Sequence, residues 1–590
     1  MVMEDPIWRP GKREFEDSNL ARYLRKLGLP DYAALHAFSV KDRAGFWKGA
    51  IEHLGIPFAT PPKATSEGEI WLPGARLNIA DACFRGDPKR RALVSVREDG
   101  TRRDMSLGEL EALSNRVSNG LLAAGFKAGD RIAIQLPMTA ECVAAYLGIV
   151  RAGMAVVSIA DSFPAEEVAK RLRVAEAKGI LTTDRFERGG KTFDLYAKAI
   201  EAKSPKAIVI GGKARRDGDQ EWDRFLSTSE TFKSIPCDPY AVTNVLFSSG
   251  TTGDPKAIPW THLTPMKCVM DGHFHQDIHP EDMVAWPTSI GWMMGPWLVY
   301  ASLANGATMA LYEGLPAGEG FVRFVREAGV TVLGVVPALV KAWRASGEVS
   351  WPGVRLFSST GEASNRDDYL WLMRTAGMKA PVIEYCGGTE IGGGHLTGSV
   401  LQPAWPAVFT TPALGLDFVV LGEDGKPVKE GEAGELFLIP PSIGLSQSLL
   451  NQDHRKVYFE GCPPGLRRHG DQVMRLSGGR WKAQGRADDT MNLGGIKVSS
   501  IELEEAVNAH PKVKESAAVA VIPGGEGADR LVVFVVSDAP VAKEELQTEI
   551  SKRLNPLFRI HDVVRVEKLP RTASNKVMRR ELRRDYLARA

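Results

Sequence analysis

The nine residues that decide the fold read Ser248-Ser249-Gly250-Thr251-Thr252-Gly253-Asp254-Pro255-Lys256. They follow an apolar run, residues 242–247, that is typical of a buried β-strand. Glycines let backbone N–H groups come close to a phosphate, and the hydroxyls and the lysine add donors and charge. The stretch is not a Walker A motif, because that motif needs Gly-Lys-Ser/Thr in direct succession. These residue types suit a phosphate-binding loop, but a cluster of glycine, serine and threonine is also typical of an ordinary solvated turn, so composition alone leaves both interpretations open.

Short apolar runs on both sides of this loop alternate with stretches of helical periodicity, such as residues 107–124 and 320–328. Strands that alternate with helices form βαβ units and largely parallel sheets. The sequence therefore predicts an α/β fold whose large N-terminal domain consists of parallel-sheet-rich subdomains. The runs expected to be buried strands are 132–135, 156–159, 207–210, 242–247, 330–336, 354–357 and 382–385.

Three of these strands, which end near Phe247, Phe357 and Tyr385, run into polar loops that contain glycine. In open α/β sheets, ligands bind outside the carboxyl ends of the strands. We therefore expect the three loops to converge on one pocket, although they lie far apart in the sequence.

The end of the chain has a different pattern. Residues 501–508 and 543–554 look helical, whereas residues 517–521 and 531–536 look like strands. This mixture predicts a small α+β domain, which begins near Arg486 after a turn-rich segment.

The composition argues against several classes of protein. The chain has 590 residues, of which 44% are hydrophobic and 25% charged, and its formal net charge is +2. These values are typical of a soluble globular protein and argue against a nucleic acid as partner. No apolar run is long enough for a membrane span. The six cysteines form no CxxC pair, and neither end shows a secretory or peroxisomal signal, so we expect free thiols and a cytoplasmic protein.

The loop at residues 248–256 resembles the phosphate loop of the adenylate-forming (AMP-binding) acyl-CoA synthetase superfamily. Five further motifs of that superfamily follow in the same order across nearly the whole chain, although Asn575 stands where the last motif has glycine. Residues 71–78 resemble the acetyl-CoA synthetase branch, and plant-type acyl-activating enzymes look most similar. The five motifs are Gly361-Glu362-Ala363, Tyr385-Cys386-Gly387-Gly388-Thr389-Glu390 (preceded by Glu384), Gly470-Asp471, Gly485-Arg486-Ala487-Asp488-Asp489, and Pro570-Arg571-Thr572-Ala573-Ser574-Asn575-Lys576.

The resemblance implies a carboxylate–CoA ligase that uses ATP, Mg²⁺ and CoA and that releases AMP and pyrophosphate. It also implies a small mobile C-terminal domain, which swings about Asp488 between the two half-reactions. The catalytic lysine then leaves the site as a glycine-bearing segment arrives. The implied parts are an N-terminal extension (residues 1–72), a large AMP-binding domain (73–485), a hinge (486–489) and the small domain (490–590).

The chemistry explains the residue types expected in the first half-reaction. The substrate carboxylate attacks the α-phosphorus of ATP, so the protein must position anions and neutralise charge. By resemblance, Glu390 anchors Mg²⁺, Thr389 donates its hydroxyl to the α-phosphate, and Lys576 bridges that phosphate and the carboxylate. The residues expected to bind ATP or AMP are Ser248, Ser249, Gly250, Thr251, Thr252, Gly253, Lys256, Gly361, Glu362, Ala363, Glu384, Tyr385, Cys386, Gly387, Gly388, Asp471, Arg486 and Lys497.

In the second half-reaction, the acyl group passes to the thiol of CoA. The resemblance places Gly494 and Gly495 on the tunnel that the pantetheine enters, and it places Arg188 and Lys191 near the CoA phosphates. Two positions depart from the family, because Ala317 replaces an asparagine that contacts CoA and Gly494 replaces a serine.

The acyl pocket is expected to differ from that of the acetyl-CoA synthetases. Trp292, Met293 and Met294 match one pocket loop of those enzymes, and Thr360 is expected to face the acyl chain. Gly387 stands where they place a tryptophan that caps the acetate site, so its missing side chain implies a longer pocket. Because none of these positions carries Arg or Lys, the resemblance favours a medium-chain, branched or aryl-bearing monocarboxylate.

Other functions stay open at this point. An adenylating enzyme that passes its acyl group to a carrier protein, or to oxygen as luciferase does, would exchange pyrophosphate without forming a thioester. An acetate or propionate ligase would prefer the shortest acids. A non-catalytic AMP-binding regulator is disfavoured, because the chain keeps Thr389, Glu390, Asp471, Arg486 and Lys576.

Two smaller expectations concern single side chains. His273, His275 and His279 invite a metal interpretation, but no regular structure brings all three together, so a polar helix–loop surface is favoured. Reversible acylation of Lys576 is a weaker hypothesis, since it would remove the charge that the adenylation step needs.

Overall fold

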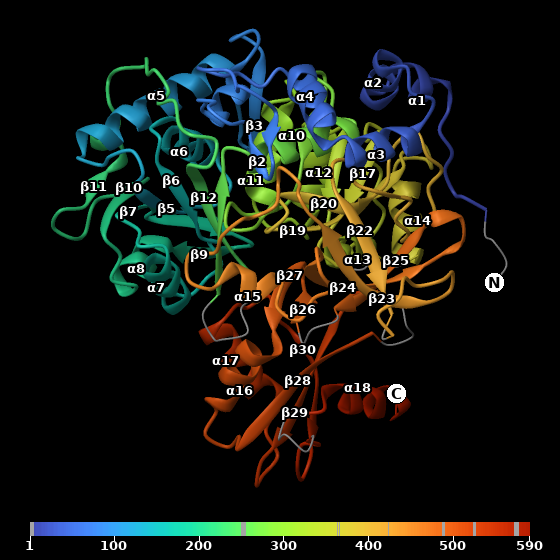
Figure 1. Cartoon of the computed structure of the whole chain (residues 1–590). Helices are drawn as coiled ribbons and strands as arrows, with labels where there is room; N and C mark the ends of the chain where they lie inside the picture. The colour runs from blue at the N-terminus through green and yellow to red at the C-terminus, as the bar shows by residue number, and fades with distance from the viewer. Residues whose placement is uncertain are drawn as a thin grey trace.

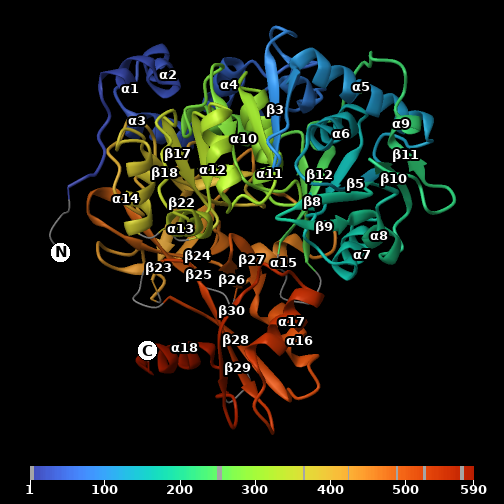
Figure 2. The same cartoon turned by 180° about the vertical axis from the view of Figure 1, so that it is seen from behind.

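A large body and a small C-terminal domain make up the molecule (Figure 1 and, from behind, Figure 2). This arrangement confirms the predicted fold class, an α/β large domain followed by a small α+β domain. The computed structural model describes residues 5–248, 255–362, 364, 366–422, 424–486, 490–522, 527–571 and 577–589.

The first of two seven-stranded sheets carries the predicted phosphate loop. Its strand order is β11-β10-β7-β5-β6-β12-β13, and neighbouring strands are parallel except for the antiparallel pair β12–β13. The strands are β5 (Arg131–Gln135), β6 (Ala155–Ser158), β7 (Gly179–Thr183), β10 (Lys206–Ile210), β11 (Gln220–Glu221), β12 (Val242–Ser248) and β13 (Lys256–Thr261).

The second seven-stranded sheet has the order β18-β17-β16-β14-β15-β3-β4, and only its edge pair β3–β4 is antiparallel. Both sheets therefore confirm the predicted parallel architecture. The strands are β3 (Arg91–Arg97), β4 (Arg102–Ser106), β14 (Met283–Ala285), β15 (Thr308–Glu313), β16 (Val332–Val335), β17 (Leu356–Ser359) and β18 (Val382–Glu384).

Helices cover the two sheets and fill the space between them (Figure 1). The helices α6, α10 and α11 are almost wholly buried. A helix that is apolar on all sides must lie inside the protein, and α6 and α11 have this composition. The helices of the large domain after the N-terminal segment are α5 (Leu107–Ala123), α6 (Ala140–Arg151), α7 (Ala165–Val174), α8 (Leu195–Glu201), α9 (Trp222–Phe225), α10 (Thr264–Phe274), α11 (Met294–Leu303), α12 (Glu319–Glu327), α13 (Pro337–Ala345), α14 (Arg366–Thr375) and α15 (His454–Tyr458), with 3-10 turns at Ile79–Phe84 and Ser477–Gly479.

Antiparallel sheets fill the region between the parallel sheets and the small domain, and the sequence analysis did not predict them. A three-stranded sheet has the order β19-β20-β21, and a four-stranded sheet has the order β22-β23-β24-β25. Their strands are β19 (Cys386–Gly388), β20 (Gly393–Thr397), β21 (Thr411–Pro412), β22 (Asp417–Leu421), β23 (Ala433–Ile439), β24 (Arg467–Arg475) and β25 (Trp481–Arg486), and a separate hairpin joins β8 (Arg185–Arg188) to β9 (Lys191–Asp194).

The N-terminal segment shares the core of the large domain. Leu20, Tyr23, Phe46 and Trp47 are fully buried in the same hydrophobic cluster as the second parallel sheet. Residues 1–72 are therefore packed on the large body where the structure describes them. The segment contains α1 (Lys12–Asp17), α2 (Asn19–Leu27), α3 (Tyr32–Lys41), α4 (Arg43–Leu54) and the short hairpin of β1 (Ser66–Glu67) and β2 (Ile70–Trp71).

The small domain has hydrophobic clusters of its own, centred on Leu503, Val533 and Ile550 on one side of its sheet and on Val532 and Phe534 on the other. The expected strands and helices at residues 501–554 are confirmed. The elements are β26 (Thr490–Leu493), β27 (Ile496–Ser499), α16 (Ser500–Asn508), β28 (Glu515–Val521), β29 (Arg530–Val536), α17 (Lys543–Arg553), β30 (Ile560–Arg565) and α18 (Arg579–Arg589).

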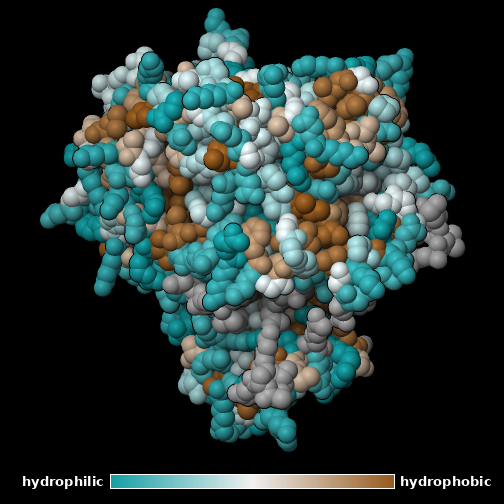
Figure 3. Space-filling view, in the orientation of Figure 1, coloured by the Kyte–Doolittle hydropathy of each residue, from teal (hydrophilic) through white to brown (hydrophobic). Residues whose placement is uncertain are grey.

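The surface carries no large apolar patch on the face drawn in Figure 3, where hydrophobic residues form separate spots among hydrophilic ones. Within the described ranges, no helix combines the length and the apolar character that crossing a membrane requires.

Candidate active site

The strands β12 and β13 form the hairpin that presents the phosphate loop. Ser248 and Lys256 pair with each other in the ladder. Asn451 fixes the second arm, because its side chain accepts from the N–H of Ala257 at 3.0 Å and donates to the carbonyl of Pro255 at 3.0 Å. The ammonium of Lys256 lies 5.5 Å above the ring of Tyr458. The loop residues Ser249, Gly250, Thr251, Thr252 and Gly253 lie outside the described residues.

The loop at residues 385–390 is held in place by its backbone. Trp260, on β13, donates its indole N–H to the carbonyl oxygen of Thr389 at 2.8 Å. The carbonyl of Glu390 accepts from the N–H of Ser446 at 2.8 Å, and the hydroxyl of Thr360 donates to the carbonyl of Tyr385 at 2.5 Å. The structure therefore brings the ends of β17 and β18 together, as the sequence predicted, whereas the loop after β12 lies outside the described residues and its place stays a prediction.

A buried polar network lies under this loop. Tyr385 donates its hydroxyl to Asp271 at 2.6 Å, and the same carboxylate accepts from the N–H of Gly394 at 2.9 Å. Lys267 forms an ion pair with Asp271 one helical turn away on α10, and both side chains are fully buried. Trp297 donates to the hydroxyl of Tyr385 at 3.2 Å. Loss of either Lys267 or Asp271 would leave the other charge buried without a partner, so the pair holds Asp271 in place. Since Asp271 accepts the hydroxyl of Tyr385, the network also fixes the position of Tyr385.

Beyond the loop, two carboxylates and a histidine lie close together. The side chain of Glu390 is buried, and its carboxylate lies 3.7 Å from Nδ1 of His469. The other ring nitrogen of His469 lies 3.2 Å from the carboxylate of Asp471. The thiol of Cys386 donates to that carboxylate at 3.4 Å. The expected magnesium anchor and the expected ribose ligand thus lie on opposite sides of one imidazole.

The predicted adenine loop faces the small domain. Glu362 accepts from the N–H of Ala338 at 3.1 Å and from the N–H of Gly495 at 3.0 Å. Burial raises the pKa of the Glu362 carboxyl above its usual range. Burial also raises the pKa of Glu384, in β18, to about 8. Ala363 lies outside the described residues.

The turn between β26 and β27 brings Gly494 and Gly495 to this loop. Both glycines have positive φ angles, +61° and +80°, which side chains rarely adopt. A Cβ atom at Gly361 would lie only 3.0 Å from the Cα of Gly495. Backbone pairing sets Arg486 opposite Asp471 and Lys497 opposite Asn492. The hinge residue Asp488 and the expected catalytic residue Lys576 lie outside the described residues.

Comparisons with known proteins match this arrangement. Residues 80–445 match the family described as AMP-binding enzyme, and residues 502–576 match its C-terminal domain. The chain belongs to the AMP-binding enzyme family. A "Probable acyl-activating enzyme 17, peroxisomal" of Arabidopsis thaliana is 44% identical, over 98% of this chain and 88% of the relative. A "Hexanoyl-CoA synthase" of Cannabis sativa is 43% identical over the same shares.

A solved structure supports the same assignment. The acetoacetyl-CoA synthetase from Streptomyces lividans superposes with a TM-score of 0.78 at 26% identity, and the match covers 98% of this chain and 95% of that one. Within the AMP-binding enzyme family, the chain is an acyl-CoA synthetase of the acetyl-CoA synthetase-like branch, similar to plant acyl-activating enzymes. It is an acid–thiol ligase of the AMP-forming type.

In this AMP-binding enzyme, the expected pocket residues lie near both domains. Trp292 packs on Phe163, with ring centroids 5.3 Å apart, and it also contacts the core of the small domain. Met293 and Met294 are half-buried at the start of α11. Gly291 before them is needed for packing, because a Cβ atom there would lie 2.0 Å from the backbone nitrogen of Ala160.

Gly387 has a structural role that the sequence analysis did not foresee. A Cβ atom at this position would lie 1.9 Å from the carbonyl oxygen of Gly393 on the paired strand β20. Any side chain here would push β19 and β20 apart. The glycine is therefore explained by the close approach of two backbones, and the missing tryptophan alone is no measure of pocket length.

The expected CoA residues Arg188 and Lys191 face each other across the β8–β9 hairpin. The guanidinium of Arg188 donates to Asp161 at 2.7 Å, so it already has a carboxylate partner. The turn between them, at Gly189, is held by the carboxylate of Glu98 at 2.9 Å. The hairpin is therefore a fixed feature of the large domain.

The expectation for the three histidines was wrong. His275 and His279 are buried, and His273 is half-buried, rather than exposed on a polar surface. His275 contacts the carbonyl of Gly398 at 3.3 Å, and burial lowers its pKa to about 4. His279 lies 3.0 Å from the carboxylate of Asp277. They are polar parts of the core, which a run of alternating histidines does not reveal.

The sequence analysis did not single out several buried polar side chains near these loops, namely Lys267, Asp271 and His469. A Lys and an Asp four residues apart in an apolar helix were the available signal for the first two.

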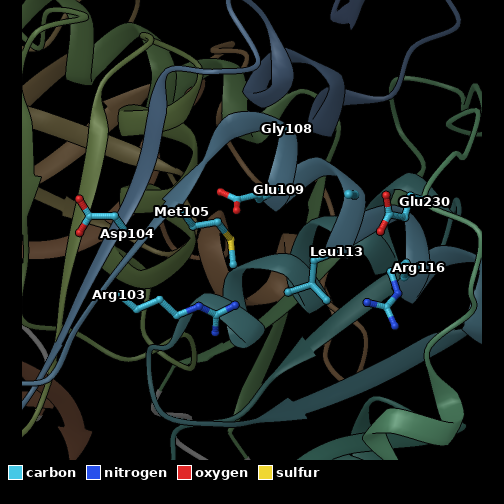
Figure 4. A pocket seen from close by; sticks show the side chains of 9 residues that line it. Arg103, Asp104, Met105, Gly108, Glu109, Leu113, Arg116 and Glu230 are labelled. Carbon is cyan, nitrogen blue, oxygen red and sulfur yellow. The ribbon is translucent and has the colours of Figure 1, made fainter.

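The structure also has a separate hollow of about 410 Å³, which none of the predicted site residues lines (Figure 4). It is lined by residues of β4, the start of α5 and Glu230.

Proposed function

We propose that this acyl-CoA synthetase activates a monocarboxylic acid larger than acetate, first as an acyl-adenylate and then as a CoA thioester. The observation that carries this proposal is the meeting of distant segments at one place. Trp260 links β13 to Thr389, Cys386 links that loop to Asp471, and Glu362 links the adenine loop to Gly495. These are the segments that both half-reactions require.

In the first half-reaction, the protein must hold the phosphates of ATP and the substrate carboxylate close together, although all of them are anionic. The phosphate loop and Lys256 supply donors and charge for the phosphates, and Thr389 supplies a hydroxyl near the α-phosphate. Asp471 accepts from the ribose hydroxyls. Lys576 bridges the attacking carboxylate and the α-phosphate. No protein nucleophile is needed, because the substrate carboxylate attacks phosphorus itself.

Magnesium fits this site by its donor chemistry. Glu390 offers a buried carboxylate next to Thr389, and Mg²⁺ is commonly bound by one or two carboxylates together with substrate phosphates. Glu390 would hold the ion, which when bound neutralises phosphate charge.

In the second half-reaction, the docked turn at Gly494 and Gly495 supports thioester formation. Because Gly495 has no side chain, the turn packs closely against Gly361 and Val336, and the pantetheine is proposed to pass beside it. Glu362 orients the turn through the N–H of Gly495. Arg188 and Lys191 are proposed to contact the CoA phosphates, with Arg188 also held by Asp161.

The substrate size rests on two supports. The relative from Cannabis sativa is named hexanoyl-CoA synthase, and the side chains at Trp292, Met293, Met294 and Thr360 carry no positive charge. A second carboxylate on the substrate would therefore lack a partner. Methionine side chains adapt to irregular apolar groups, which suits an aliphatic chain.

An AMP-release screen tests the proposal. Acetate, propionate, butyrate, hexanoate, a branched acid and an aryl-bearing acid are each assayed with ATP and Mg²⁺, with and without CoA. We expect AMP release to require CoA and kcat/KM to be higher for hexanoate than for acetate. A preference for acetate or propionate overturns the substrate size. Pyrophosphate exchange without any thioester would instead indicate another acyl acceptor, such as a carrier protein.

We also propose two properties that the fold leaves untested, cytoplasmic location and reversible acylation of Lys576. Acylation would remove the charge that adenylation needs. Mass spectrometry of the native protein under varied carbon supply tests the modification, and a fluorescent fusion tests the location. The relative from Arabidopsis thaliana is named peroxisomal, so a punctate signal is the result that contradicts the cytoplasmic location.

A further inference from the structure

Four metal-ligating side chains meet beside the expected ribose site. Cys386 lies on β19, His395 on β20, and His469 and Asp471 on β24. Ligand atoms of Cys386, His395 and Asp471 all lie within 4.8 Å of one another. His469 and Asp471 flank Gly470 at an irregular point of β24, and Nε2 of His469 lies 3.2 Å from the carboxylate of Asp471.

The distances to one carboxylate oxygen of Asp471 have the size that a tetrahedral metal site requires. Sγ of Cys386 lies 3.4 Å away, Nε2 of His469 lies 3.2 Å away, and Nε2 of His395 lies 3.6 Å away. Bonds of 2.0 to 2.3 Å from Zn²⁺ to N, O and S ligands imply ligand–ligand separations of about 3.3–3.8 Å. The ligand atoms of Cys386, His395 and Asp471 are thus close enough to share one ion, and His469 joins them by a movement of its ring towards the same position.

His469 gives independent support. Its imidazole is fully buried, and within the part of the chain that the structure describes neither ring nitrogen makes a hydrogen bond. Nε2 points to Asp471, while Nδ1 points to the carboxylate of Glu390 at 3.7 Å. Histidines that bind a metal commonly direct their second nitrogen to a carboxylate, which fixes the ring and its tautomer. The burial of a polar ring between two carboxylates suits such a role.

The geometry points to a Zn²⁺ site formed by Cys386, His395, His469 and Asp471, which overlaps the ribose end of the nucleotide site. A thiolate, two imidazoles and a carboxylate form a donor set that Zn²⁺ favours and that Mg²⁺ does not. The strands hold all four side chains on rigid elements. Cys386 is half-buried and provides access from solvent. Binding displaces the thiol proton, so it weakens as the pH falls.

Competition with the nucleotide follows if Asp471 binds the ribose, and this second step rests on the proposed function. The carboxylate cannot accept from ribose hydroxyls and ligate a metal ion with the same oxygen. Zn²⁺ would therefore inhibit adenylation by occupying part of the nucleotide site. By linkage, AMP must weaken Zn²⁺ binding by the same factor by which Zn²⁺ weakens AMP binding.

Metal titration of the metal-free full-length protein tests the site. With Co²⁺ as the probe, we expect one equivalent to produce a thiolate charge-transfer band and the visible absorption of a tetrahedral ion, and Zn²⁺ to remove both. Cys386→Ser should abolish the charge-transfer band, and His395→Gln should weaken Zn²⁺ binding at least about tenfold. Cys462→Ser is the matched control, because Cys462 is the other half-buried cysteine and should change nothing. A band that persists in Cys386→Ser, or no band in the wild type, overturns the site.

A second measurement needs no variant. Alkylation of the native protein by iodoacetamide is followed by mass spectrometry with and without Zn²⁺. Protection of Cys386 but not of Cys462 supports the site, and equal labelling overturns it. Addition of AMP then separates the two steps of the inference. If Zn²⁺ protects Cys386 and AMP does not weaken that protection, the metal site stands and the ribose role of Asp471 is wrong.

Discussion

The loop at residues 385–390 and the turn at Gly494–Gly495 reach the same site but are held very differently. The indole N–H of Trp260 and the backbone N–H of Ser446 donate to carbonyl groups of the loop and fix it, and the Lys267–Asp271 pair lies beneath it. The turn is docked through the N–H of Gly495 on Glu362. The difference indicates that the nucleotide side is built into the core, whereas the small domain docks through contacts that it can give up.

The hydrophobic clusters show the same contrast. The largest cluster of the large domain runs from the N-terminal helices to β18, and two further clusters lie within the same domain. The small domain has separate clusters, and Trp292 packs against one of them from the large domain. Asn555 adds a contact to Ser162 at 3.5 Å. A domain with its own core can move as a unit without loss of its fold.

The largest effect on stability is expected from the buried Lys267–Asp271 pair beneath the loop at residues 385–390. Asp271→Asn should lower the stability of the large domain by about 3–5 kcal/mol, because it leaves the buried ammonium of Lys267 without its charge partner. Denaturant unfolding measures this loss. Glu16→Gln is the matched control, since Lys12 and Glu16 have the same spacing in a helix but are exposed and should contribute little.

A double variant decides whether the charge or the shape matters. Lys267→Met combined with Asp271→Leu should cost less than Asp271→Asn alone, because no charge then stays buried without a partner. Equal losses in the single and double variants would mean that the network contributes packing only.

The next largest effect is expected where the turn at Gly494–Gly495 of the small domain contacts Glu362. Glu362→Ala removes an acceptor for the N–H of Gly495, and hydrogen bonds to charged groups are worth about 1.5–3 kcal/mol, or roughly ten- to a hundredfold in rate. We expect thioester formation from supplied acyl-AMP to fall by more than adenylation does, with a smaller change in Glu362→Gln. If both half-reactions fall by one common factor, Glu362 acts through the adenine loop and not through docking.

The pH dependence of stability tests the burial of Glu384. Its pKa is raised to about 8 in the folded protein, so the folded state keeps a proton that the unfolded chain loses above its ordinary pKa. Stability should therefore fall as the pH rises towards 8, by about 1.4 kcal/mol per pH unit within that window. Thermal unfolding of Glu384→Gln between pH 5.5 and 7.5 should show a flatter dependence than the wild type. Parallel curves would contradict the burial of a neutral carboxyl.

The smallest effects concern the acyl pocket. Met293→Ala and Met294→Ala should change the ratio of kcat/KM for hexanoate over acetate, since each buried methylene is worth about 0.8 kcal/mol.

Gly387→Trp should instead lower the activity with every acid, because a Cβ atom would meet the carbonyl of Gly393 at 1.9 Å. A selective loss of long acids in Gly387→Trp would restore the cap interpretation.

The sequence predicted the parts of the fold that follow from local pattern. The strands that became β5, β12 and β18 are apolar runs of the right length, and their ends differ from the expected ones by a residue or so. The loops after β17 and β18 meet because parallel strands share a carboxyl edge. The antiparallel sheets formed by β19 to β25 went unpredicted, because their pairing depends on contacts between distant segments.

The motifs predicted candidate site residues, but they did not predict the buried side chains that pack around those residues. Glu390 and Asp471 lie on either side of His469, and Glu362 contacts Gly495, while the roles that the resemblance gives these residues stay predictions. His469 between two of them, and Asp271 under Tyr385, belong to no motif and became visible only when strands and helices were packed together. The expectation for the histidines at the end of α10 and just after it failed for the same reason, since burial by distant segments is not encoded in their spacing.

The account's central claim is that two half-reactions use one fixed nucleotide side and two positions of the small domain. Lys576→Ala tests it most directly, with Lys568→Ala as a control at an exposed lysine of the same domain. Adenylate formation and thioester formation from supplied acyl-AMP are measured separately in each variant. The account predicts that Lys576→Ala nearly abolishes the first reaction and leaves the second largely intact. Equal loss of both reactions in a folded Lys576→Ala protein would contradict it.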